Sequence, residues 1–168
     1  MKKVLIISAS DSSLPVMEGV SKVLDEFEVD YTLTISSAHR SPQRTLQLVK
    51  EFQKNGGKVI ICGAGLAAHL AGVVAAHFPL PVIGVPLKDK GGLEGLEGLD
   101  ALLATMQMPG GVPVATVGID NAKNAGILAV QILAVSDKDL EKKIIDYKKE
   151  LAKDVEQKAA NVKEYGSD

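Results

Sequence analysis

Short runs of β-branched and other apolar residues recur along this chain, and each is followed by a stretch with helical periodicity. The apolar runs lie at residues 4–8, 31–36, 58–62, 81–85 and 112–117, and the helical patterns at residues 15–27, 41–55, 63–76, 99–106, 121–135 and 138–162. Strands that are apolar along their whole length are buried on both faces, and β–α alternation favours a parallel sheet. We therefore predict an α/β fold: a three-layer, doubly wound parallel sheet of flavodoxin-like strand order, with a long C-terminal helix.

The length and composition fit a single domain. The chain has 168 residues, of which 46% are hydrophobic and 24% charged, as is ordinary for a globular protein that buries a core. Neither a linker nor an internal repeat is visible. We expect an α/β domain over residues 1–136, with residues 137–168 as a helical tail of that same domain.

Charge and residue types argue against several classes of function. The 19 Lys and Arg residues nearly balance the 21 Asp and Glu residues, and Trp is absent, so neither a basic field nor stacking platforms for nucleic acid are expected. No apolar run approaches the roughly 20 residues of a membrane span, so we expect a cytoplasmic protein. Cys62 is the single cysteine, and the three histidines lack metal-ligand spacing, so we expect no metal site.

Four loops carry most of the unusual residues of the sequence. They follow the predicted strands, at residues 8–14, 36–42, 63–70 and 86–98. In doubly wound folds the ligand binds outside the carboxyl ends of the strands, where the strand order reverses. We therefore expect these loops to form the functional site.

The first loop reads Ser-Ala-Ser-Asp-Ser-Ser over residues 8–13, ahead of a predicted helix. The free N–H groups and the dipole of a helix N-terminus favour an anion, and Ser10 and Ser12 add hydroxyl donors. Ser and Asp are also ordinary N-capping residues. Phosphate binding and capping alone both remain open.

The second loop places His39 and Arg40 beside another helix N-terminus. Arg40 offers a forked set of donors suited to phosphate or carboxylate, and His39 can transfer protons near neutral pH. Local packing is the alternative role for His39.

The third loop contains the small residues Gly63, Ala64 and Gly65, which let a ligand approach the backbone closely. The Gly-x-Gly-x-x-Gly pattern of dinucleotide-binding proteins is incomplete, because Ala68 stands at its last position. His69 follows, either as a ligand contact or as a structural histidine.

Taken together, these motifs resemble those of the N5-carboxyaminoimidazole ribonucleotide mutase family, over most of the chain up to about residue 137. The resemblance is carried by Ser37-Ala38-His39-Arg40-Ser41-Pro42, Gly63-Ala64-Gly65, Ala67-Ala68-His69-Leu70, Gln107-Met108-Pro109-Gly110-Gly111-Val112-Pro113 and Asn121-Ala122-Lys123-Asn124-Ala125-Gly126. It implies that residues 1–136 are a nucleotide-binding catalytic domain.

The resemblance implies a reaction of de novo purine biosynthesis. The substrate would be an aminoimidazole ribonucleotide with a carboxylate on its exocyclic amine, and the enzyme, an isomerase, would move that carboxylate to the adjacent ring carbon. Carbon dioxide would be released within the pocket and recaptured by the ring carbon, which then loses a proton. No metal or organic cofactor is implied. A homo-octamer is implied, with an upstream ATP-dependent carboxylase as the candidate supplier of substrate.

The resemblance also assigns roles to residues. His39 would be the catalytic acid and base. Ser10 and Arg40 would hold the phosphate, with Ser37 alongside, while Gly63, Ala64 and Gly65 would line the base. The remaining predicted substrate-binding residues are Asp11, Ser13, Ala38, Leu66 and His69.

The sequence departs from the family pattern at several positions. Ser13 stands where an aspartate is expected to bind the ribose hydroxyls, with Asp11 as a candidate substitute. Ala9 and Leu66 stand at glycine positions, and the loop over residues 88–98 is longer than usual. Direct carboxylation of aminoimidazole ribonucleotide by carbon dioxide therefore stays open, as does a non-catalytic or re-purposed nucleotide-binding paralogue. The resemblance favours the mutase, because Arg40 follows His39 here, whereas the direct carboxylases of the family have a His-Lys pattern.

Overall fold

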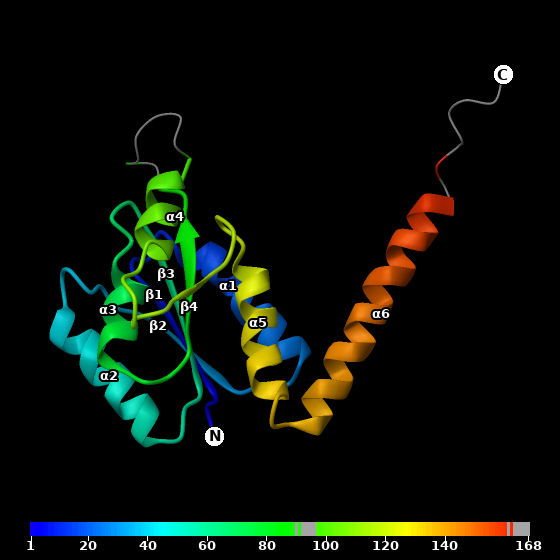
Figure 1. The fold of residues 1–168 in the computed structure, drawn as a ribbon, viewed down its shortest axis with the longest axis horizontal. Helices are drawn as coiled ribbons and strands as arrows, with labels where there is room; N and C mark the ends of the chain where they lie inside the picture. The colour runs from blue at the N-terminus through cyan, green and yellow to red at the C-terminus, as the bar shows by residue number, and fades with distance from the viewer. Residues whose placement is uncertain (90, 92–96, 161, 163–168) are drawn as a thin grey trace.

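A five-stranded parallel sheet lies between two layers of helices (Figure 1). The computed structural model describes residues 1–89, 91, 97–160 and 162. The strands are β1 (Val4–Ser8), β2 (Tyr31–Ile35), β3 (Val59–Gly65), β4 (Val82–Leu87) and β5 (Ala115–Thr116), in the spatial order β2-β1-β3-β4-β5. The helices are α1 (Leu14–Glu26), α2 (Pro42–Lys54), α3 (Leu70–His77), α4 (Leu99–Met106), α5 (Ala122–Ala134) and α6 (Lys138–Ala160). The predicted doubly wound fold, its strand order and its long C-terminal helix are confirmed.

The core has two parts, one on each face of the sheet. Successive strand side chains point to opposite faces, so Ile6 and Ile61 pack with α1 and α5, while Leu5 and Ile60 pack with α2, α3 and α4. All five residues of β1 are buried. This double burial explains why β1, β3 and β4 read as continuous apolar runs, whereas β2 is only partly buried.

The register of the sheet brings the functional loops together. Ser8 at the end of β1 pairs with Ile35 of β2 on one side and with Gly63 of β3 on the other. Further along β3, Gly65 pairs with Leu87 at the end of β4. The loops that follow these four strands therefore all start at the same side of the sheet, where the carboxyl ends of the strands lie.

Two predicted elements need correction. The helix predicted over residues 63–76 begins only at Leu70, because the chain stays in β3 through Gly65 and pairs with β4 there. The strand predicted over residues 112–117 shortens to Ala115–Thr116, which pair only with Ile83 and Gly84 of β4. The greater length predicted for the loop over residues 88–98 falls largely outside the described residues, since 90 and 92–96 are not described.

Helix α6 packs against the domain only near its start. Leu140 and Ile144 are buried there, and Tyr147 packs edge-on against Phe27 with ring centroids 5.5 Å apart. Beyond that point α6 projects away from the domain, as Figure 1 shows in orange and red, and Val155 is 65% exposed. Among the described residues, no helix is both long and apolar enough to cross a membrane.

Candidate functional site

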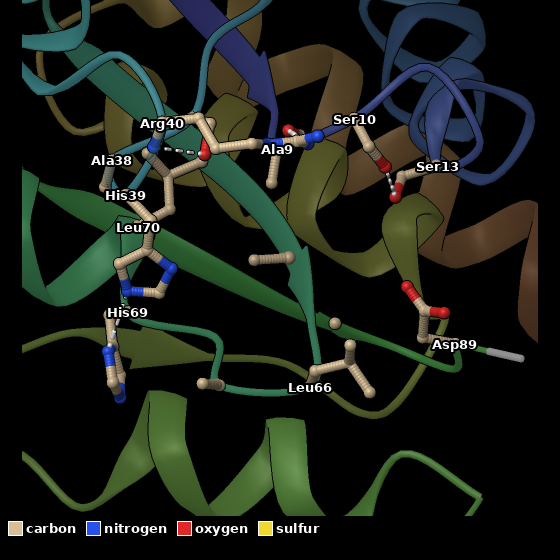
Figure 2. A pocket seen from close by; sticks show the side chains of 14 residues that line it. Ala9, Ser10, Ser13, Ala38, His39, Arg40, Leu66, His69, Leu70 and Asp89 are labelled. Carbon is tan, nitrogen blue, oxygen red and sulfur yellow. Dashed lines mark hydrogen bonds between the residues drawn. The ribbon is translucent and has the colours of Figure 1, made fainter. Parts of the chain in front are cut away.

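A pocket of about 310 Å³ opens at the edge of the sheet where the functional loops meet (Figure 2). It is lined by Ala9, Ser10, Ser13, Ser37, Ala38, His39, Arg40, Ala64, Gly65, Leu66, Ala67, His69, Leu70 and Asp89. These residues follow β1, β2, β3 and β4 in the sequence. The pocket therefore lies where the ligand site of a doubly wound sheet is expected.

The first loop presents a cluster of hydroxyl groups at the start of α1. Ser10 Oγ lies 2.9 Å from Ser12 Oγ and 2.8 Å from Ser13 Oγ. Ser13 is the N-cap residue of α1, but its side chain makes no capping hydrogen bond. The hydroxyl groups of Ser10 and Ser13 thus line the pocket beside a helix N-terminus, an arrangement that suits an anion.

Arg40 brings a positive charge to the same end of the pocket. Its backbone N–H donates to Ser37 Oγ at 3.2 Å, and its Nη2 donates to the Ala9 carbonyl at 3.4 Å. The guanidinium group therefore bridges the loops that follow β1 and β2. A guanidinium group beside serine hydroxyls can bind a phosphate through several charge-assisted hydrogen bonds.

The third loop passes through a tight bend at Leu66. The backbone of Leu66 has a φ of 54°, in the left-handed region that costs a non-glycine residue roughly 1 kcal/mol. The bend turns the chain from the end of β3 toward His69, the N-cap residue of α3. It exposes the backbone of Gly65 and the side chain of Leu66 to the pocket.

The two histidines of the site are in direct contact. His39 Nε2 lies 3.0 Å from His69 Nδ1, with the ring planes at 89° to each other. Both rings line the pocket, and Figure 2 shows them together at the end away from Asp89. Two imidazoles in contact are groups that can transfer protons, and they lie in the same pocket as Arg40.

The pocket contains all the predicted site residues except Asp11, Ser12 and Gly63. Asp11 lies in a neighbouring groove, where its Oδ1 accepts from the N–H of Ser12. Gly63 is packed against α1, since a Cβ at this position would lie 2.3 Å from Met17 Sδ, and its carbonyl accepts from the N–H of Ala9. Gly63 thus contacts the first loop through its backbone carbonyl and does not itself line the pocket.

Sequence reasoning missed Asp89, the one carboxylate among the described residues that line the pocket. The loop that holds it, residues 86–98, was expected near the ligand because it follows a strand at the carboxyl edge. Ala67 and Leu70, which belong to a quoted motif but were not predicted to bind substrate, also line the pocket.

The described residues form no metal-binding group, and the cysteine lies outside the pocket. Within the described residues, no three or more His, Cys, Asp or Glu side chains come together as a metal-binding group. Cys62 is buried in β3, and burial raises the pKa of its thiol. The thiol therefore behaves as a small core side chain.

Fold and pocket together define a doubly wound α/β protein with a pocket that combines Arg40 and serine hydroxyls with a pair of imidazoles. Residues 3–154 match the sequence family described as AIR carboxylase, and the chain belongs to this family. It is 50% identical over 161 residues to the N5-carboxyaminoimidazole ribonucleotide mutase of Pyrococcus horikoshii, covering 96% of this chain and 89% of that protein. It is 49% identical over 166 residues to the mutase of the same name from Thermotoga maritima, covering 99% of this chain and 95% of that protein.

The fold has a match among solved structures as well. The crystal structure of Treponema denticola PurE superposes with a TM-score of 0.86 at 25% sequence identity, covering 96% of this chain and 98% of that one. The resemblance seen in the loop motifs thus extends to the whole architecture.

Proposed function

We propose that this chain is an N5-carboxyaminoimidazole ribonucleotide mutase, an isomerase of purine biosynthesis. The observation that carries the proposal is the contact between His39 and His69 in a pocket whose far end holds Arg40 and the serine hydroxyls. A ribonucleotide has a phosphate for the cationic end and a base that reaches toward the imidazoles. Membership of the AIR carboxylase family and the names of the two relatives support the same reaction.

The proposed reaction needs two proton transfers, and His39 provides both. Release of carbon dioxide from the exocyclic nitrogen requires that this nitrogen receive a proton. When the ring carbon recaptures the carbon dioxide, that carbon must lose a proton to become aromatic again. His39 gives the first proton and accepts the second, so the enzyme returns to its starting state. His69, at 3.0 Å from His39, orients the ring that does this.

The phosphate and the ring are held by different parts of the pocket. Arg40 and Ser10 bind the phosphate, with Ser37 alongside, aided by the N-terminus of α1. Ala64, Gly65 and Leu70 present a surface of small and apolar groups to the base. Such a surface limits water around the released carbon dioxide and so favours its recapture.

A paired turnover assay tests the proposal. One reaction contains freshly made N5-carboxyaminoimidazole ribonucleotide, and the other contains aminoimidazole ribonucleotide with high bicarbonate. Product carboxylated on carbon should form quickly in the first reaction and slowly in the second. Efficient product in the bicarbonate reaction would instead establish a direct carboxylase, and no product in either would establish a paralogue with another ligand.

Assembly and location complete the proposal. We expect a homo-oligomer, an octamer by the resemblance, acting in the cytoplasm on substrate that an ATP-dependent carboxylase provides. The apolar Leu151 and Val155 on the projecting part of α6, 48% and 65% exposed, support assembly through this helix. Light scattering coupled to size-exclusion chromatography measures the number of subunits.

A further inference from the structure

Asp89 introduces a negative charge into a pocket otherwise suited to an anion. It lines the same pocket as Arg40, Ser10 and Ser13. A carboxylate has only acceptor atoms, and so do the phosphate and the carboxylate of the proposed substrate. Asp89 therefore cannot face either of these groups without electrostatic repulsion, and its partner on the ligand must be a neutral donor.

The position of Asp89 is fixed by the end of the sheet. The preceding residue, Lys88, donates its backbone N–H to Asp120 Oδ1 at 2.9 Å, which holds the chain as it leaves β4. A Cβ on Gly65 would lie 3.0 Å from the Cβ of Asp89 and 3.3 Å from its Oδ2. The carboxylate thus packs against the pocket-lining backbone of Gly65, at a place where any larger residue would displace it.

Among the described residues, one oxygen of Asp89 accepts a hydrogen bond and the other accepts none. Oδ1 accepts from the N–H of Gly91 at 3.0 Å. Oδ2 has no hydrogen-bond partner in the part of the chain that the structure describes, and the Nζ of the adjacent Lys88 pairs with Glu97. The carboxylate is thus oriented by the loop with an acceptor atom left for a ligand.

The arrangement of the pocket selects the donor. Figure 2 shows Asp89 on the side of the pocket opposite His39 and His69, nearer to Ser13. The exocyclic nitrogen and the reacting carbon of the substrate must lie at His39, because His39 exchanges protons with them in the proposed reaction. The sugar then lies on the side of the pocket where Asp89 is. The vicinal hydroxyl groups of ribose are neutral donors, and a carboxylate can accept from them.

We propose that Asp89 accepts hydrogen bonds from the ribose hydroxyl groups and makes the pocket selective for ribonucleotides over 2′-deoxyribonucleotides. The inference rests on the proposed function, because that function supplies the ribonucleotide. Ser13 offers only a hydroxyl at the neighbouring wall, and Asp11 lines an adjoining groove rather than the pocket itself. Asp89 supplies the carboxylate from the loop after β4, whereas Asp11 and Ser13 belong to the loop after β1.

The test compares the binding of ribose 5-phosphate and 2-deoxyribose 5-phosphate to the full-length protein, by titration followed with NMR. The wild-type protein should bind the ribose compound about ten-fold more tightly or more, as expected for a hydrogen bond to a charged acceptor. Asp89→Ala should bind the two compounds equally. The readout is the ratio of the two dissociation constants, which a general change in phosphate affinity leaves unchanged.

Two further variants make the result specific. Asp146→Ala removes the same charge from the distant helix α6 and should keep the wild-type ratio. Asp11→Ala should keep it too, and loss of selectivity in this variant, with selectivity retained in Asp89→Ala, would overturn the proposal. Absence of selectivity in the wild-type protein would overturn it as well. Because neither sugar phosphate contains the imidazole, failure of the turnover assay alone would refute the proposed function and leave this result intact.

Discussion

His39 and His69 are thirty residues apart in the sequence, yet His39 Nε2 lies 3.0 Å from His69 Nδ1 at the mouth of one pocket. The contact exists because β2 and β3 flank β1, so that the loops following them leave the same edge of the sheet. At a ring angle of 89°, the edge of one imidazole meets the other. A hydrogen bond between the two nitrogens, donated by either ring, favours this orientation of the His39 ring.

Replacing His39 by Asn should remove turnover while leaving ligand binding. The amide keeps much of the volume of the ring but cannot exchange a proton near neutral pH. We expect kcat to fall by about 10²- to 10⁴-fold, the usual contribution of a general acid–base group. Calorimetric titration with aminoimidazole ribonucleotide should give a dissociation constant close to that of the wild-type protein. Turnover that survives this change would contradict the proposed mechanism.

The combination of His39→Asn with His69→Asn should be strongly non-additive. If His69 acts by orienting His39, replacing His69 should cause no further loss of kcat in a protein that already lacks the His39 imidazole. We expect His69→Asn alone to reduce kcat with little change in KM, and the double variant to match His39→Asn. Additive losses in the measured rates would assign an independent role to His69.

Replacing Arg40 by Met should weaken substrate binding more than it slows the chemical step. The guanidinium group lies at the phosphate end of the pocket, where Nη2 donates to the Ala9 carbonyl. Loss of a charge-assisted hydrogen bond, worth about 1.5–3 kcal/mol, corresponds to a rise in KM of about 10- to 100-fold. The matched control is Lys50→Met on the exposed surface of α2, outside this pocket, which should leave KM unchanged. A fall in kcat with an unchanged KM would place the phosphate elsewhere.

The sequence predicts where the site lies in the fold better than it predicts which side chains are in contact there. His39, Arg40 and the serines were predictable because parallel strands end at one edge and ligands bind there. Contact between His39 and His69 was not predictable, since it depends on the register that pairs Ser8 with both Ile35 and Gly63. Register across parallel strands far apart in the chain leaves no local signal in the sequence.

Asp89 and the start of α3 were missed for related reasons. Asp89 is one of several polar residues in its loop, and only the pairing of Leu87 with Gly65 places it against the pocket. The stretch from Gly63 to Ala68 consists of small residues and one leucine, without the periodicity that separates strand from helix. The extension of β3 through Gly65 therefore depends on its hydrogen-bonded pairing with β4. This pairing is a tertiary contact, which the local sequence does not reveal.

The attachment of α6 should weaken in acid through Asp137. A hydrogen bond from the N–H of Leu140 and one from Lys3 lower the pKa of the Asp137 carboxyl from its usual range. A carboxyl group whose pKa is lowered by folding stabilises the folded state above the unfolded-state pKa, about 3.9, and loses this contribution as the pH falls through the folded value. Asp137→Asn should therefore be less stable than the wild-type protein at pH 7, with the difference shrinking at lower pH.

Urea denaturation at a series of pH values measures this difference. Glu26→Gln, which neutralises an exposed carboxylate of α1, serves as the control and should change the free energy of unfolding little at any pH. A difference between wild-type and Asp137→Asn proteins that stays constant down to about pH 3 would exclude the ionised carboxylate as its source.

A side chain at Gly84 of β4 should destabilise the protein, because α4 packs closely on this strand. A Cβ added to Gly84 would lie 2.3 Å from Thr105 Cγ2 and 3.0 Å from Val114 Cγ1, so α4 and the chain entering β5 would have to move. Overpacking of this kind typically costs about 1–3 kcal/mol, so Gly84→Ala should lower the free energy of unfolding by that amount. Gly110→Ala is the matched control, because nothing lies within 4 Å of the added Cβ. Equal stabilities of the two variants by urea denaturation would mean that α4 does not pack on β4 as closely as the structure shows.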